Sequence, residues 1–156
     1  MRKGRFFKGA IAAGALLWPL SGAAAADLTK QTPIEVRVAL GNKAGAHVFQ
    51  PSALTFETGK LYKLVLTNPS GTKHYFTSPG LARSVYTRKV QVVDGQGTKV
   101  EIKGTIREIE VYPGGVAEWW FVPVAAGRFN DLHCHIRGAD GRTHAEHGMR
   151  GSVTIR

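Results

Sequence analysis

Apolar and polar residues alternate along several short stretches of the chain, and this two-residue period indicates strands with one buried face. The clearest strands are expected at 34–40 and 61–68, and a shorter strand at 74–77 ends before Pro79. Only 81–89 is typical of a helical turn or two. Further strands, separated by turn residues, are expected at 90–93, 98–104, 106–112, 116–124, 128–136 and 151–155.

Eight or nine short strands without a long helical period favour an all-β sandwich or barrel with antiparallel strands. Trp119 and Trp120 are neighbours in one expected strand, so one side chain should face the core and the other should face outward. The sequence after residue 26 contains no linker or internal repeat. We therefore expect a single domain over residues 27–156.

The first 26 residues have the pattern of an export signal. Four basic residues lie between positions 2 and 8, an apolar stretch runs from Gly9 to Leu20, and Ala24 and Ala26 form the small-residue pattern that a signal peptidase accepts. The apolar stretch is shorter than the roughly 20 residues that cross a bilayer as a helix. We predict a signal peptide at 1–26 and a location in the periplasm.

Composition and charge narrow the class of protein further. Of the 156 residues, 43% are hydrophobic and 21% are charged, which excludes a disordered polymer. Removal of residues 1–26 takes away four positive charges, so the net charge falls from +10 to +6. No nucleic-acid-binding motif accompanies this charge, and we expect no nucleic-acid partner. Cys134 is the single cysteine, and an unpaired thiol in an exported protein calls for a function.

Metal-binding residue types gather in the segment 132–149, LHCHIRGADGRTHAEHGM. It holds four of the six histidines, the single cysteine, and Met149, which is the only methionine outside the predicted signal peptide. A thiolate, imidazoles and a thioether together suit copper, which alternates between soft Cu(I) and harder Cu(II), whereas a thioether offers little to zinc. Because one loop cannot surround a metal, a histidine from a distant strand is also needed, and His74 is the candidate.

Two parts of the sequence resemble the cupredoxins, the blue copper protein family that includes plastocyanin and azurin. The first part is FQPSALTFETGKLYKLVLTNPSGTKHYF at 49–76, and the second is VAEWWFVPVAAGRFNDLHCHI at 116–136 followed by HAEHGMRGSVTI at 144–155. The resemblance implies a Greek-key β-sandwich or barrel of about seven to nine strands with a short helical turn in the middle. It also implies one type 1 copper ion, with the ligands His74, Cys134, His144 and Met149.

The choice of the second histidine ligand depends on spacing. Four residues separate His144 from Met149, as in the family, whereas the rival His147 lies much closer to Met149. Nine residues separate Cys134 from His144, more than in small cupredoxins. This longer stretch leaves the geometry of the site open.

The remaining histidines are given other roles. His133 and His135 flank the cysteine, and on an extended strand their side chains leave by the face opposite the thiol. The triplet around Cys134 is also similar to multicopper oxidases, but their further copper centres need other His-x-His motifs, and this chain has only one. Whether His135 takes part in the site stays open, and His47 is expected at the surface.

The resemblance implies an exported blue copper protein that carries single electrons, is not an enzyme, and is a monomer without a membrane segment after signal cleavage. An exposed imidazole edge would face a redox partner, and basic residues such as Lys99 and Lys103 favour an acidic docking face on that partner. One alternative is a periplasmic protein that sequesters or delivers copper. The least favoured alternative is a copper enzyme similar to nitrite reductase or a multicopper oxidase.

Overall fold

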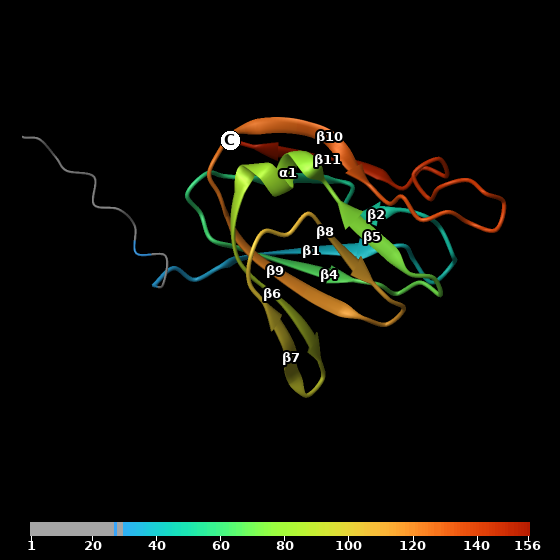
Figure 1. Ribbon diagram of the computed structural model, residues 1–156, viewed down its shortest axis with the longest axis horizontal. Coiled ribbons are helices and arrows are strands. Elements are labelled where there is room, and N and C mark those ends of the chain that lie inside the picture. The colour runs from blue at the N-terminus through green and yellow to red at the C-terminus, as the bar shows by residue number, and fades with distance from the viewer. Residues whose placement is uncertain (1–26, 28–29) are drawn as a thin grey trace, which may run out of the picture.

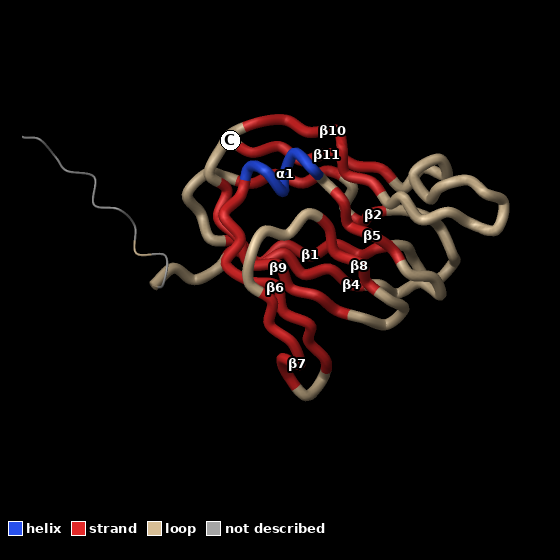
Figure 2. Tube along the Cα trace, viewed as in Figure 1, coloured by secondary structure: helices blue, strands red, loops and turns tan. Residues whose placement is uncertain are grey.

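Two curled β-sheets with one short helix make up the described part of the chain, Asp27 and residues 30–156, in a computed structural model (Figures 1 and 2). The predicted signal peptide lies outside these residues. The first sheet has the order β2 (Phe49–Gln50), β1 (Ile34–Leu40), β4 (Tyr62–Thr67), β9 (Val116–Pro123), β6 (Val85–Asp94) and β7 (Gly97–Ile102). The second has the order β3 (Ala53–Phe56), β11 (Arg150–Ile155), β10 (Gly127–His133), β5 (His74–Thr77) and β8 (Glu108–Val111). The predicted all-β sandwich is therefore confirmed.

Two strand pairs differ from the antiparallel arrangement that was expected. β1 runs parallel to β4, and β3 runs parallel to β11. The chain leaves the first sheet after β2, forms β3 in the second sheet, and returns as β4 beside β1. Because this route crosses between the layers, the returning strand points in the same direction as its neighbour, which a hairpin connection does not allow.

The helix α1 (Pro79–Ser84) is shorter than the predicted stretch 81–89 and begins earlier. It starts with a proline, whose fixed backbone angle suits the first turn. Asp131 of β10 fastens this start, because its carboxylate accepts hydrogen bonds from Ser78 Oγ at 2.7 Å and Gly80 N at 2.6 Å. From Val85 onward the chain pairs with β9. This tertiary pairing decides that the following residues form a strand.

The core lies between the two sheets and is rich in aromatic side chains. Phe56 of β3 packs edge-on against Phe121 of β9, with ring centroids 5.2 Å apart. Trp119 is 1% exposed, while its neighbour Trp120 turns outward, where the Lys89 ammonium lies 4.8 Å from its ring centroid. The predicted alternation of the two tryptophans is therefore confirmed.

Three loops gather at the end of the sandwich that lies opposite the C-terminus, on the right in Figure 1. They are 41–48 before β2, 68–73 before β5, and 134–149 between β10 and β11. Each loop leads directly into a strand of one of the two sheets. His47 and His144, which lie in two of these loops, and His74, which directly follows the third, therefore meet at this end. Among the described residues, no helix has the length and apolar character that a bilayer-crossing helix requires.

Candidate metal centre

Asn68 shapes the turn that delivers His74 to the site. Its side-chain amide donates hydrogen bonds to the carbonyl oxygens of Thr72 at 2.7 Å and Val111 at 2.8 Å, and its Oδ1 accepts one from Ser70 N at 3.0 Å. These bonds join the turn to β8. His74, the first residue of β5, is completely buried as a result.

Ser70 fixes the orientation of the His74 ring. Ser70 Oγ lies 2.9 Å from His74 Nε2, and the same hydroxyl has acceptors at 2.7 Å (Asn68 Oδ1) and 2.9 Å (Thr72 O). When the hydroxyl gives its one proton to either of these oxygens, it can accept the proton of the His74 tautomer that is protonated at Nε2. His74 Nδ1 is then left with a free lone pair, as a metal ligand requires.

Cys134 follows β10 directly and is completely buried. Its Sγ accepts a hydrogen bond from Tyr75 N at 3.3 Å, which ties the sulfur to β5. His133 is half-buried and His135 is exposed, and the His135 ring stacks on Tyr75 at 4.4 Å between centroids. The expectation that these two histidines face away from the buried thiol agrees with this arrangement.

The nine residues between Cys134 and His144 form a small hairpin, which brings the two ends of the segment together. A bridge pairs Arg137 with Thr143, and His144 N donates to Ile136 O at 2.8 Å. Ala145 N then donates to Cys134 O at 2.9 Å. The extra length therefore projects from the site, and His144 lies beside Cys134 in spite of it.

Three potential ligand atoms from these segments converge. His74 Nδ1 lies 3.0 Å from His144 Nδ1, and Cys134 Sγ lies 3.9 Å from the former and 3.5 Å from the latter. A circle through three atoms with these separations has a radius of about 2.0 Å, close to the roughly 2.0–2.1 Å length of a metal–imidazole bond. The three donors therefore fit around a single metal ion.

Met149 is connected through its backbone to the residues that carry two of these donors. Its side chain is completely buried, its backbone N–H donates to His144 O at 2.9 Å, and its carbonyl accepts from Cys134 N at 3.3 Å. These two bonds attach Met149 to both neighbouring donors. A thioether next to a thiolate and two imidazoles is the donor set that suits copper.

His147 does not join this group of donors. Its Nε2 lies 2.8 Å from Asp140 Oδ2, so the hairpin carboxylate holds the ring. The group of possible metal-binding histidines found among the described residues contains His144 and not His147. The geometry thus places His144, and not its rival, among the converging histidines.

The prediction that His47 lies at the surface is wrong. It is half-buried, and its ring stacks on His144 with 3.8 Å between centroids and 17° between planes. One ring nitrogen from each of His47, His74 and His144 lies within 4.8 Å of the others. His144 is consequently only 3% exposed, so the expected exposed imidazole edge is not found. Nothing in the sequence around His47 marks it, because its neighbours in the site come from loops far away in the chain.

Burial controls the protonation of the centre. Burial lowers the pKa of His74 to about 4, with a further contribution from the nearby His144. Burial also lowers the pKa of His144 and of His47, and it raises the pKa of the Cys134 thiol. The imidazoles are therefore neutral at pH 7 and have lone pairs to offer, and a bound cation would favour the thiolate that burial disfavours.

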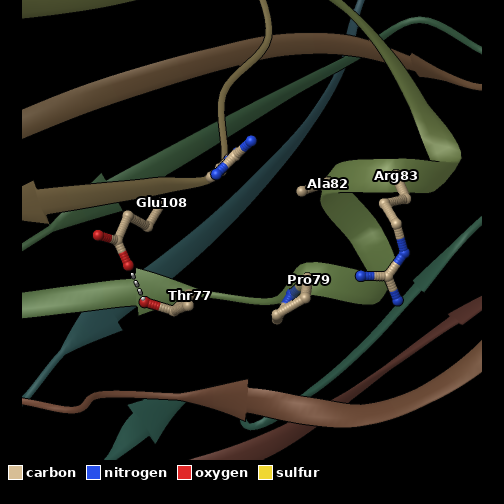
Figure 3. Close-up of a pocket in the computed structure, with 6 residues that line it drawn as sticks. Thr77, Pro79, Ala82, Arg83 and Glu108 are labelled. Atoms are coloured by element: carbon tan, nitrogen blue, oxygen red, sulfur yellow. Dashed lines mark hydrogen bonds between the residues drawn. The ribbon is translucent and has the colours of Figure 1, made fainter.

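A surface pocket of about 510 Å³ lies elsewhere, between α1 and β8 (Figure 3). Glu108 in its wall accepts a hydrogen bond from Thr77 Oγ1 at 3.1 Å, and Arg83 and Arg107 also line it. It contains none of the converging donors. The candidate centre is thus a packed cluster beneath the loops, and none of its donors lines this pocket.

No family model and no curated protein sequence matches the chain. Among solved structures, dithionite-reduced auracyanin from the photosynthetic bacterium Roseiflexus castenholzii is similar with a TM-score of 0.50 and 15% identity, over 78% of this chain and 96% of that chain. The chain has the cupredoxin fold. The same fold accounts for the similarity to parts of larger copper enzymes.

One such enzyme is a multicopper oxidase, with a TM-score of 0.52 and 12% sequence identity. Another is copper nitrite reductase from Nitrosomonas europaea, with a TM-score of 0.51 and 10% sequence identity. The matches cover 81% and 80% of this chain but only 46% and 48% of those chains. This chain thus spans about half the length of either enzyme chain. Cupredoxin folds of this kind occur both in small proteins and in enzymes.

Proposed function

We propose that this protein is an exported type 1 copper protein that carries single electrons in the periplasm and is not an enzyme. The observation that carries the proposal is the convergence of His74 Nδ1, His144 Nδ1 and Cys134 Sγ, within 3.0 to 3.9 Å of one another, from separate segments of the fold. Copper bound there supplies a one-electron couple between Cu(I) and Cu(II). Met149 is the proposed weak axial ligand.

The surroundings of the donors support a centre that changes little between two oxidation states. Ser70 holds the His74 ring, Tyr75 N holds the Cys134 sulfur, and the base of the hairpin holds His144 through Ile136 O. Each of these contacts belongs to a strand end or to a turn bonded to a strand. A ligand cage fixed in this way keeps the reorganisation on electron transfer small.

The similarity in fold supports a carrier over an enzyme. It extends over 96% of the auracyanin chain, but over less than half of the nitrite reductase and multicopper oxidase chains. Only one group of converging metal donors is found among the residues that the structure describes.

The proposed partner is a redox protein that docks as a transient complex with a monomer of this chain. In the β6–β7 hairpin Lys99 pairs with Asp94 at 3.5 Å, and Lys103 directly after it pairs with Glu101 at 3.2 Å, a carboxylate that Lys89 shares. We therefore expect only a weak contribution of these lysines to docking on an acidic surface. Measuring the association rate at increasing ionic strength checks this expectation.

The visible spectrum after addition of one equivalent of Cu(II) tests the proposal. An intense band from the Cys134 thiolate is expected, and Cys134→Ser should abolish it. His144→Ala should abolish or strongly alter the band, whereas the matched variant His147→Ala should keep it. A wild-type protein that binds copper without such a band contradicts the proposed centre.

A second measurement separates an electron carrier from a copper delivery protein. A carrier shows a reversible couple in voltammetry and retains copper in both states. Rapid loss of Cu(I) to a chelator of moderate affinity, with no reversible couple, would instead support the delivery function.

A further inference from the structure

Two arginines line the surface pocket between α1 and β8, and neither is paired with a carboxylate. Arg83 lies in the last turn of α1, Arg107 directly precedes β8, and both residues are exposed. Neither guanidinium group has an ion pair or a hydrogen bond among the described residues. Glu108 is the third charged residue of the wall, so two positive charges accompany one negative charge. The pocket therefore favours an anionic occupant.

The carboxylate of Glu108 already has neighbours on its own side of the pocket. Its Oε2 accepts a hydrogen bond from Thr77 Oγ1 at 3.1 Å and lies 3.7 Å from His135 Nδ1. Thr77 and Glu108 lie on one side of the pocket, and Ala82 and Arg83 of α1 lie on the other (Figure 3). With about 510 Å³, the pocket has room for a carboxylate side chain, which a guanidinium group binds through two parallel hydrogen bonds.

The lysines nearest to this face are already paired. Lys89 and Lys103 each lie 3.2 Å from Glu101, and Lys99 lies 3.5 Å from Asp94. An acidic partner that binds these lysines has to compete with the carboxylates of the protein itself. Binding at the two arginines of the pocket breaks no such pair, so their charge is available to a partner.

The same pocket adjoins the residue that follows the proposed cysteine ligand. His135 is exposed and is joined to Cys134 by a peptide bond. Its Nδ1 lies 3.5 Å from Thr77 Oγ1 and 3.7 Å from Glu108 Oε2, and both of these residues line the pocket. Its ring also stacks on Tyr75, whose backbone N–H donates to Cys134 Sγ at 3.3 Å. Two short routes therefore connect the thiol sulfur with the pocket wall.

The surface above His144 offers a partner no comparable access. His144 is 3% exposed and lies beneath the ring of His47, with 3.8 Å between the two centroids. Electron tunnelling weakens steeply with distance, so a partner there has the His47 ring between itself and the centre. A partner over the pocket meets the ring of His135, which is one peptide bond away from the cysteine.

We propose that the redox partner docks through an acidic face over the pocket between α1 and β8, where Arg83 and Arg107 bind it and His135 carries the electron. The inference rests on the proposed function and names the surface that its partner uses. The redox group of the partner gains the one electron that the centre loses, or the reverse, and no covalent bond is formed or broken.

Hexacyanochromate(III), a paramagnetic trianion, maps the docking surface on the metal-free protein. It broadens the amide NMR signals near the place where it binds, and we expect broadening at residues 79–83 and 107–108. The double variant Arg83→Gln, Arg107→Gln should lose it. The matched control Lys99→Gln, Lys103→Gln removes the same number of positive charges and should keep it. Broadening centred on the β6–β7 hairpin or on the loop 41–48 in the wild-type protein overturns the docking surface.

Hexacyanoferrate(III) tests electron transfer, because it takes one electron from the reduced, copper-loaded protein and becomes hexacyanoferrate(II). Stopped-flow measurement of the thiolate band gives the rate constant. At low ionic strength the rate constant of the arginine double variant should fall by at least about tenfold, the lower end of the effect of electrostatic steering. The lysine control should fall by a smaller factor. Equal losses in the two variants contradict a specific role of the arginines.

His135→Leu tests the route of the electron. Its rate constant should fall severalfold, while the broadening by hexacyanochromate(III) and the visible spectrum stay as in the wild type. His133→Leu is the matched control, because His133 also flanks Cys134 but its Nδ1 is bonded to Asp131 O at 2.7 Å. Equal rate constants in His135→Leu and the wild type overturn the route through His135.

The two kinds of measurement separate this inference from the proposed function. Absence of the thiolate band from the copper-loaded wild-type protein overturns the proposed function, and the route of the electron with it. The mapping on the metal-free protein needs neither copper nor a variant, so it decides the docking surface by itself.

Discussion

At the scale of single residues, the site depends on small groups that let the His74 ring lie where it does. Gly41 has a backbone φ of +71°, and a Cβ there would be 2.7 Å from His74 Nε2 and 2.8 Å from Ser70 Cβ. The hydroxyl of Ser70 in turn lies 2.9 Å from Nε2, where it can accept the proton of the tautomer that leaves Nδ1 free for a metal. Both residues act on the ligand without belonging to the donor set.

Gly41→Ala should destabilise the protein and weaken copper binding, because the new methyl group meets His74 and Ser70 in addition to the strain of a left-handed backbone. Gly45→Ala is the matched control, since Gly45 also has a positive φ of +82° but nothing within 4 Å of its Cβ position. The control should lose only the roughly 1–2 kcal/mol of backbone strain. Urea unfolding of the metal-free proteins measures the difference, and equal losses in the two variants would contradict the argument.

Ser70→Ala should lower the Cu(II) affinity by about ten- to a hundredfold, the usual effect of removing the partner that orients a ligating histidine. Thr72→Val removes a longer contact, 3.4 Å from Thr72 Oγ1 to the same nitrogen, and should have a smaller effect. Chelator competition measures both. An unchanged affinity in Ser70→Ala would show that the ring is held by packing alone.

At the scale of elements, the hairpin at 137–143 explains how a long spacing is compatible with a compact site. The bridge between Arg137 and Thr143 and the bond from His144 N to Ile136 O close its base, while its tip carries the turn residues. The geometry of His144 is thus set at the base of the hairpin. The tip contacts the site indirectly, through the bond between Asp140 and His147 and through the bond from the Arg142 guanidinium to Glu146 O at 3.1 Å.

Replacing residues 138–142 by Asn-Gly should leave the copper centre coloured, because a two-residue turn of this type can join Arg137 to Thr143 with the pairing retained. The variant should lose some thermal stability with the Asp140–His147 bond. The visible spectrum with Cu(II) is the decisive measurement. Loss of the thiolate band in a folded variant would mean that the tip itself positions His144.

At the scale of the whole molecule, folding buries imidazoles that water surrounds in the unfolded chain. His74 is completely buried, and burial lowers its pKa from the ordinary 6.5 to about 4. Between these two values the unfolded chain binds a proton that the folded protein does not bind. The folded state of the metal-free protein is therefore favoured above pH 6.5 and loses stability as the pH falls toward 4.

The free energy of unfolding of the metal-free protein should thus decrease by about 2 kcal/mol from His74 alone between pH 7.5 and pH 5. The lowered pKa of His144 acts in the same direction. Urea unfolding at the two pH values measures the change, and His74→Leu should show a flatter dependence on pH. An equally steep dependence in that variant would assign the effect to other groups.

The strands and the types of donor could be predicted because they depend on local order in the sequence. Alternation of apolar and polar residues marks strands such as β1 and β4, and the side chains of Cys134 and Met149 are identifiable as soft ligands wherever they lie. The helix was misplaced because pairing of Val85 with β9, and the carboxylate of Asp131 on β10, determine where α1 begins and ends. These partners are distant in the chain and leave no local signal.

By itself, the sequence determined that this chain forms a β-sandwich and has the donor chemistry that suits copper, since residue type and periodicity are properties of the chain alone. Only the tertiary structure decided that His47, expected at the surface, lies against the predicted pair His74 and His144. It brings His74 and His144 to 3.0 Å from one another across 70 positions and stacks His47 on His144. The place of His47 arises from the packing of two sheets and their loops, and no spacing along the chain encodes it.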